Sequence, residues 1–266
     1  PEDRLQLTEY QQPALLTVGV ACWRVLAARG VRADMTAGLS LGEYGALVLA
    51  GALDFADAVR VVRQRGRFMQ EAVPPGRGAM AALLGLETER VEAICREVAA
   101  AGAGVIEPAN YNCPGQVVVA GERAAVEAAV ERAREAGARR AVLLPVSAPF
   151  HCSLMRPAAE RLAEVLARVT IRPARVPVVA NVTAEPVTDP EEIRRLLVEQ
   201  VDHPVRWEQS VRRMLAEGVT RLVEMAPGKT LTGFARRIDR SLEAVAAGTA
   251  EEVMDLVASA ERGLLA

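Results

Sequence analysis

The chain has 266 residues, of which 51% are hydrophobic and 25% are charged, and its formal net charge is -2. That balance is typical of a soluble globular protein, and it excludes a disordered chain or a basic protein that coats nucleic acid. With aromatic residues at only 3% and no apolar run near the roughly 20 residues that cross a bilayer, we expect neither nucleic-acid stacking nor membrane insertion.

The first segment, residues 1–75, is predicted to contain helices around one short strand. Hydrophobic periodicity indicates the helices, and the pair Pro74 and Pro75 ends the last of them. The expected elements are a helix over 12–29, a strand over 32–37, a turn over 38–42, a helix from Glu43 and a helix over 54–72 with Asp54 as its N-cap.

Residues 76–147 change to the order βαββαβ, which is the split-βαβ, ferredoxin-like pattern of a compact unit. The expected elements are a strand over 78–86, a helix over 87–101, strands over 105–109 and 117–120, a helix over 122–136 and a strand over 141–146. We therefore predict a small domain inserted into a larger one.

Residues 148–266 alternate helices with short apolar strands, as a parallel α/β layer does. The helices are expected over 154–169, 190–200 and 207–217, and the strands over 176–181 and 220–225. Together with residues 1–75, this segment is predicted to form the large domain.

Gly38-Leu39-Ser40-Leu41-Gly42 fits the pattern G-x-S-x-G of a nucleophile elbow, a tight turn from strand to helix that exposes the serine hydroxyl. Side chains at both glycine positions are expected to collide with neighbouring backbone. The alternative is an ordinary strand-helix connection with a capping serine. In an elbow, the Leu41 amide and the start of the helix can stabilise an oxyanion.

A serine nucleophile needs a base, and the chain has two histidines. His203 precedes Pro204 and is flanked by charge, which indicates an exposed loop. His151 follows the last strand of the insert, and this junction between two domains is a typical cleft position. We therefore predict His151 as the base, against the alternative of a structural histidine. No Asp or Glu stands in a persuasive position for a triad, so a main-chain carbonyl or amide is the candidate partner of its ring.

Arg65 lies on an otherwise apolar helix face. The residues that share this face at helical spacing are Ala58, Val62, Met69 and Ala72, whereas the other arginines of the helix fall on the opposite side. An arginine that faces inward must meet an anion, because an unpaired buried charge costs several kcal/mol. Its partner is either an internal carboxylate or a substrate carboxylate held beside the acyl group.

The four cysteines and two histidines are too scattered to form a metal site or a C-x-x-C pair, so we expect free thiols and no bound metal. The first residues, Pro1 to Arg4, resemble neither a signal peptide nor a transit peptide. These features predict a protein of the cytoplasm, or of an organelle matrix after removal of a leader.

Several motifs in the sequence together resemble one enzyme family. They are Gln12-Pro13-Ala14-Leu15-Leu16, Gly38-Leu39-Ser40-Leu41-Gly42-Glu43-Tyr44, Arg65-Gly66-Arg67-Phe68-Met69-Gln70, Asn110-Tyr111-Asn112-Cys113-Pro114-Gly115-Gln116, Val146-Ser147-Ala148-Pro149-Phe150-His151 and Pro227-Gly228-Lys229-Thr230-Leu231-Thr232-Gly233. In that order and spacing the chain resembles the bacterial malonyl-CoA:acyl carrier protein transacylases, which load malonyl units for fatty acid synthesis. The resemblance implies an α/β-hydrolase-like large domain with a parallel sheet, 1–75 and 148–266, and a ferredoxin-like small domain, 76–147.

The resemblance also implies roles for individual residues. Ser40 attacks the thioester, His151 is base and then acid, and Arg65 pairs with the free carboxylate of malonyl. The Leu41 amide serves the oxyanion, and Gln200 orients His151 through its main chain. Malonyl-CoA is then a substrate, no cofactor is expected, acyl carrier protein is the partner, and the chain is expected to be a monomer.

Residues 206–240 carry eight Lys and Arg against four Asp and Glu, which makes this segment a candidate landing patch for an acidic partner.

Two departures from the family pattern keep other functions open. The family usually carries His where this sequence has Leu39. It also begins with a strand and a Gly-Gln-Gly-x-Gln loop whose glutamine amide supplies half of the oxyanion hole, and by the family's spacing this sequence starts after that loop, as a truncated copy or record would. Malonyl transfer is the leading hypothesis. The alternatives are a serine hydrolase or thioesterase, and a catalytically impaired acyltransferase that only binds carrier protein.

Overall fold

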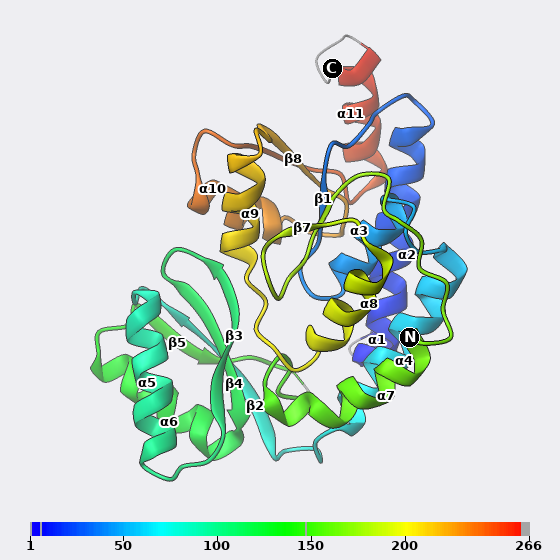
Figure 1. Cartoon of the computed structure of the whole chain (residues 1–266). Helices are drawn as coiled ribbons and strands as arrows, with labels where there is room; N and C mark the ends of the chain where they lie inside the picture. Colours follow the sequence, from blue (N-terminus) through cyan, green and yellow to red (C-terminus); the bar gives the residue numbers. More distant parts are fainter. Residues whose placement is uncertain (1, 6, 147, 262–266) are drawn as a thin grey trace.

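The computed structural model of the chain describes residues 2–5, 7–146 and 148–261, in which helices and strands alternate (Figure 1). The helices are α1 (Glu2–Leu5), α2 (Thr8–Ala27), α3 (Gly42–Leu49), α4 (Phe55–Glu71), α5 (Thr88–Ala100), α6 (Arg123–Glu135), η1 (Ser153–Met155), α7 (Arg156–Leu166), α8 (Pro190–Glu199), α9 (Trp207–Ala216), α10 (Thr230–Ile238) and α11 (Ala250–Glu261). The strands are β1 (Thr36–Ala37), β2 (Gly78–Leu84), β3 (Ile106–Cys113), β4 (Gln116–Glu122), β5 (Arg140–Leu143), β6 (Val178–Val179), β7 (Pro186–Val187), β8 (Arg221–Glu224) and β9 (Glu243–Ala246). None of the helices in the described ranges is both long and apolar enough to cross a membrane.

The segment from β2 to β5 forms a four-stranded sheet, shown in teal and green at the lower left of Figure 1. Its strand order is β3-β4-β2-β5, and every neighbouring pair is antiparallel. Side chains alternate along β2, so that Ala81 and Leu83 pack against α5 and α6, while Met80 and Ala82 face the other way. This order confirms the ferredoxin-like pattern. The chosen boundaries at residues 75 and 148 stay a prediction.

The second face of this sheet connects the small unit to the rest of the chain. Met80 and Ala82 share an apolar cluster with Cys152, and Phe150 packs against the same cluster. Because these two residues flank His151 in sequence, the sheet supports the backbone on both sides of that histidine.

The remaining strands form two separate short sheets. β1 pairs with β6 in parallel and β6 with β7 in antiparallel, while β8 and β9 form a parallel pair of their own. A cavity of about 590 Å³ lies between residues 31–37, which lead into β1, and residues 218–225, which contain β8. The predicted parallel pairing is therefore confirmed for β1 with β6 and for β8 with β9, and the cavity lies between these two sheets.

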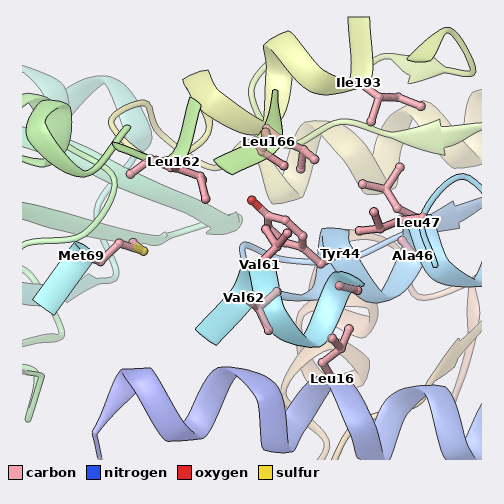
Figure 2. Close-up of a cluster of buried hydrophobic side chains, with 14 of the residues drawn as sticks. Leu16, Tyr44, Ala46, Leu47, Val61, Val62, Met69, Leu162, Leu166 and Ile193 are labelled. Carbon is pink, nitrogen blue, oxygen red and sulfur yellow. The ribbon is translucent and has the colours of Figure 1, made fainter. Parts of the chain in front are cut away.

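The main core lies where α2, α3, α4, α7 and α8 meet (Figure 2). Leu16, Leu47, Val62, Leu162 and Ile193, one from each of these helices, are all at most 3% exposed. Burial of each such side chain contributes roughly 1.5–3 kcal/mol. The core thus fixes α3, which directly follows Ser40 of the predicted elbow, and α4, which carries Arg65.

The predicted bounds of several helices and strands are wrong in detail. The strands expected over 32–37 and 176–181 shrink to two residues each, and the sequence did not indicate α1, α10, α11, β7 or β9. Asp54 does stand at the N-cap of α4, but its carboxylate accepts hydrogen bonds from Arg172 at 2.9 and 3.0 Å instead of capping the helix backbone.

Candidate active site

Ser40 stands on the turn that was predicted as a nucleophile elbow. β1 ends at Ala37, α3 begins at Gly42, and Ser40 has a φ of 53°, in the left-handed region that other residues than glycine rarely adopt. A Cβ at Gly38 would lie 2.0 Å from the carbonyl carbon of Gly42, whereas a Cβ at Gly42 would meet no described heavy atom within 4 Å. The predicted collision is therefore confirmed at Gly38 and wrong at Gly42.

His151 lies beside this serine, although 111 residues separate them in the chain. Its Nε2 is 2.7 Å from the Ser40 Oγ, and its Nδ1 is 2.8 Å from the main-chain oxygen of Gln200. A carbonyl oxygen can only accept, so Nδ1 carries the proton and Nε2 is free to accept from the serine hydroxyl. The ring partner is thus a main-chain carbonyl, one of the two alternatives that the sequence left open.

Burial decides the charge of His151. The side chain is 3% exposed, and burial, followed by the positive charge of Arg65, lowers its pKa to about 3. The imidazole is therefore neutral at ordinary pH and can take a proton. His203, by contrast, is exposed, as predicted, and its Nδ1 is engaged with Glu199 and Asp202 outside the site.

Arg65 is buried, as its helix face predicts, with only 1% of its surface exposed. Its Nη1 donates to Gln12 Oε1 at 2.7 Å, and its Nη2 donates to Gln200 Oε1 at 2.8 Å and to Ser40 Oγ at 3.0 Å. Within the described residues it makes no ion pair with a carboxylate, and its Nε has no hydrogen-bond partner. The internal salt bridge considered from the sequence is absent there, because no described carboxylate lies within ion-pair distance of Arg65. The buried Glu43 attracts its positive charge only at longer range.

Three further buried polar residues support the site, and none of them had a predicted role. Asn181 accepts from the Ser40 amide at 2.6 Å and donates to the Gly38 carbonyl at 2.7 Å. Glu43 accepts from the Gln200 side chain at 2.7 Å, and burial raises its pKa to about 7. The third is Gln12, which is 5% exposed. Its signal was present, because Gln12 falls at i and i+4 spacing with buried Leu16 on α2.

The N-cap of α3 leaves a backbone donor next to Ser40. The Leu41 amide donates to no acceptor among the described residues, while the amides of Ser40, Gly42 and Glu43 are all bonded. A free amide at the start of a helix can donate to a developing oxyanion. The described residues contain no group of three or more side chains that could hold a metal ion.

These features define a class of protein. A mixed α/β scaffold presents a serine on a strained turn, a neutral histidine 2.7 Å from its hydroxyl and a buried guanidinium beside both. This is the constellation of enzymes that form an acyl-serine intermediate, because the base activates the hydroxyl and the free amide can stabilise the tetrahedral state.

The chain belongs to the acyl transferase domain family, which it matches over residues 1–264. It is 52% identical over 247 residues to malonyl CoA-acyl carrier protein transacylase of Escherichia coli (strain K12), covering 92% of this chain and 79% of that protein. The protein of the same name from Bacillus subtilis (strain 168) is 48% identical over 251 residues, covering 94% and 79%. A malonyl-transacylase solved in complex with a type II polyketide synthase acyl-carrier protein superposes with a TM-score of 0.94 at 45% identity, covering 97% of this chain and 84% of that one.

The two glycines of the elbow allow a matched test. We expect Gly38→Ala to lower the free energy of unfolding by about 1–3 kcal/mol and to slow acylation of Ser40, because the new Cβ overlaps the Gly42 carbonyl. Gly42→Ala adds a Cβ at a helical position with open space around it. It should change the free energy of unfolding and the activation free energy of acylation by no more than about 0.5 kcal/mol each. Thermal unfolding and acylation kinetics measure the two effects, and equal damage from both substitutions would contradict this account.

The lowered pKa of His151 predicts a flat pH profile. Because the imidazole stays neutral well below its ordinary pKa of 6.5, kcat/KM for acylation should change less than about threefold between pH 5 and pH 8, since kcat/KM reports the free enzyme. The measurement is thiol release from a thioester substrate, with circular dichroism to verify that the fold persists at each pH. A tenfold fall per unit below pH 6.5 would instead indicate an ordinary histidine.

Proposed function

We propose that this chain transfers a malonyl group from coenzyme A to the phosphopantetheine thiol of acyl carrier protein, through a malonyl-Ser40 intermediate. The observation that carries the proposal is the buried guanidinium of Arg65, which lies 3.0 Å from the Ser40 hydroxyl and has no carboxylate partner among the described residues. The names of the relatives and the carrier-protein complex of a structural neighbour support it.

The first half-reaction loads the serine. The Ser40 Oγ attacks the thioester carbonyl carbon while His151 Nε2 takes the hydroxyl proton, and the Leu41 amide donates to the oxyanion. The C–S bond then breaks, and the sulfur of coenzyme A leaves with the proton that His151 returns. The Gln200 carbonyl, 2.8 Å from Nδ1, stabilises the imidazolium between these two transfers.

The second half-reaction repeats these steps in reverse with another thiol. The phosphopantetheine sulfur gives its proton to His151 and attacks the ester carbon of malonyl-Ser40. The C–O bond breaks, His151 protonates the Ser40 oxygen, and malonyl-carrier protein leaves. The reaction conserves a thioester, so it needs neither an oxidant nor a further cofactor.

Arg65 selects an acyl group that ends in a carboxylate. One CH₂ group separates the two carboxyl carbons of malonyl, so a malonyl ester on Ser40 places its free carboxylate close to a group that is 3.0 Å from the ester oxygen. The guanidinium can bind that carboxylate through two parallel hydrogen bonds, which an acetyl group cannot form.

The alternative functions lack such support. A serine hydrolase has no use for Arg65, and its triad acid would be expected where His151 Nδ1 meets a carbonyl. An impaired acyltransferase is disfavoured by the intact contact between Ser40 and His151. Leu39 packs in the apolar cluster of Val179 and Trp207, where its side chain fills space beside β6.

The compartment, the surface that binds carrier protein and the oligomeric state are further parts of this proposal. We assign the protein to the cytoplasm, and the four free cysteines fit a reducing compartment. The basic segment 206–240 is retained as the landing patch for carrier protein, although Arg212, Arg213, Arg221 and Lys229 already pair with glutamates. A monomeric state is expected.

The proposed function predicts a covalent intermediate. Incubation with malonyl-CoA and without carrier protein should add the mass of one malonyl group to the peptide that contains Ser40, and addition of carrier protein should remove it. Intact-protein and peptide mass spectrometry measure this, with Ser40→Ala as the control. An unlabelled wild-type peptide, under conditions that label the Escherichia coli relative, would refute the proposal.

The role of Arg65 predicts a change in acyl preference. Arg65→Ala should reduce kcat/KM for malonyl-CoA by a factor of about 30 or more, because truncation of one partner of a buried charge pair costs roughly 2–5 kcal/mol. The loss with acetyl-CoA should be much smaller. Arg67→Ala, which removes an exposed arginine of the same helix that pairs with Glu71, is the matched control. Equal losses with both substrates would mean that Arg65 does not bind the malonyl carboxylate.

A further inference from the structure

The backbone of Ser40 is held on both sides by side chains from distant parts of the chain. Asn181 accepts from the Ser40 amide at 2.6 Å and donates to the Gly38 carbonyl at 2.7 Å, so one amide group spans the turn. Gln200 Nε2 donates to the Ser40 carbonyl at 3.0 Å. Ser40 has a φ of 53°, and a left-handed conformation of a residue with a Cβ persists only where the surroundings determine it.

Glu43 joins these two side chains to each other. Its Oε2 accepts from the Asn181 main-chain amide at 3.1 Å and from Gln200 Nε2 at 2.7 Å. Asn181 and Gln200 are fully buried, and Glu43 is 3% exposed. Glu43 makes no ion pair within the described residues, so these hydrogen bonds, with a smaller contribution from the charge of Arg65, compensate the burial of its carboxyl group.

The three residues come from separate elements and converge at the elbow. Asn181 follows β6, Gln200 is the C-cap of α8, and Glu43 is in the first turn of α3. The Ser40 amide already donates to Asn181, which leaves the Leu41 amide as the free donor of the turn among the described residues. The same contacts that hold the turn therefore also decide which amide is available to an oxyanion.

We propose that Asn181 and Glu43 are positioning residues for the nucleophile: Asn181 fixes the peptide groups around Ser40, and Glu43 fixes Asn181 relative to Gln200. They act through the direction of the Ser40 hydroxyl and of the Leu41 amide, and neither contacts the substrate. This inference rests on the proposed function, since it concerns the formation of acyl-Ser40.

The test compares acylation rates with substrate affinity. In single-turnover experiments at saturating malonyl-CoA, Asn181→Ala should slow the labelling of Ser40 by about 10- to 100-fold, because a small misplacement of reacting atoms has effects of this size. The Kd for malonyl-CoA, measured by calorimetry in a Ser40→Ala background, should stay within about twofold. If Asn181→Ala does not fold, Asn181→Asp decides, since it keeps the acceptor for the Ser40 amide, loses the donor to Gly38, and should label more slowly than wild type.

A conservative and a disruptive change separate the role of Glu43 from simple stability. Glu43→Gln should label nearly as fast as wild type, because a single oxygen, Oε2, accepts both hydrogen bonds and the amide oxygen can replace it. Glu43→Ala, which removes both hydrogen bonds, should label Ser40 more slowly than wild type. The matched control is Glu224→Ala, which removes another buried carboxylate, one that binds the start of α10 through the amides of Leu231 and Thr232. This control should lower the melting temperature without slowing acylation of the folded protein.

The outcomes are distinguishable. Unchanged rates in folded Asn181→Ala and Glu43→Ala, or losses explained wholly by weaker binding of malonyl-CoA, would overturn the positioning role. So would a Glu43→Gln variant as slow as Glu43→Ala. Failure of wild type itself to become labelled would overturn the proposed function instead.

Discussion

The guanidinium of Arg65 lies inside the core, and a charge in that position needs polar partners on several sides. Gln12 from α2, Gln200 from the end of α8 and the Ser40 hydroxyl supply them. The Tyr44 ring adds a contact of 5.5 Å to the guanidinium. One charge thereby connects four segments that are far apart in sequence, and the rest of the site is arranged around this connection.

The same charge links substrate binding to the basicity of His151. In the free protein the pKa of His151 is lowered first by burial and then by Arg65. A bound carboxylate offsets the charge of Arg65, which removes the second of these causes and raises the pKa of the histidine. The imidazole therefore becomes a stronger base when a carboxylated acyl group is in place. An acyl group without a carboxylate would leave it as weak as before.

Much of the site could be predicted because its signals are local. The elbow is a pentapeptide, Arg65 stands out from the period of one helix, and His151 follows from a short list of candidate bases. Asn181 and Glu43 could not be found in this way, because the hydrogen bond between them joins residues 138 positions apart. The pairing partners of the strands were also out of reach: apolar runs predict strands, but pairing depends on which two strands lie side by side, and β8 pairs with β9, which the sequence did not indicate.

The main-chain partner of His151 can be understood from Arg65 as well. In a hydrolase triad a carboxylate on Nδ1 stabilises the imidazolium. Here an additional carboxylate beside the ring would also lie near the guanidinium, pair with it and compete with an anionic substrate for the same charge. A carbonyl stabilises the imidazolium with a dipole and leaves the guanidinium free of a counter-ion. Glu43, the buried carboxyl group nearby, is held by Asn181 and Gln200 and attracts Arg65 only at longer range, without an ion pair among the described residues. A site that must bind a carboxylate at a fixed cation is therefore better served by a histidine held through the backbone than by one held through an acid.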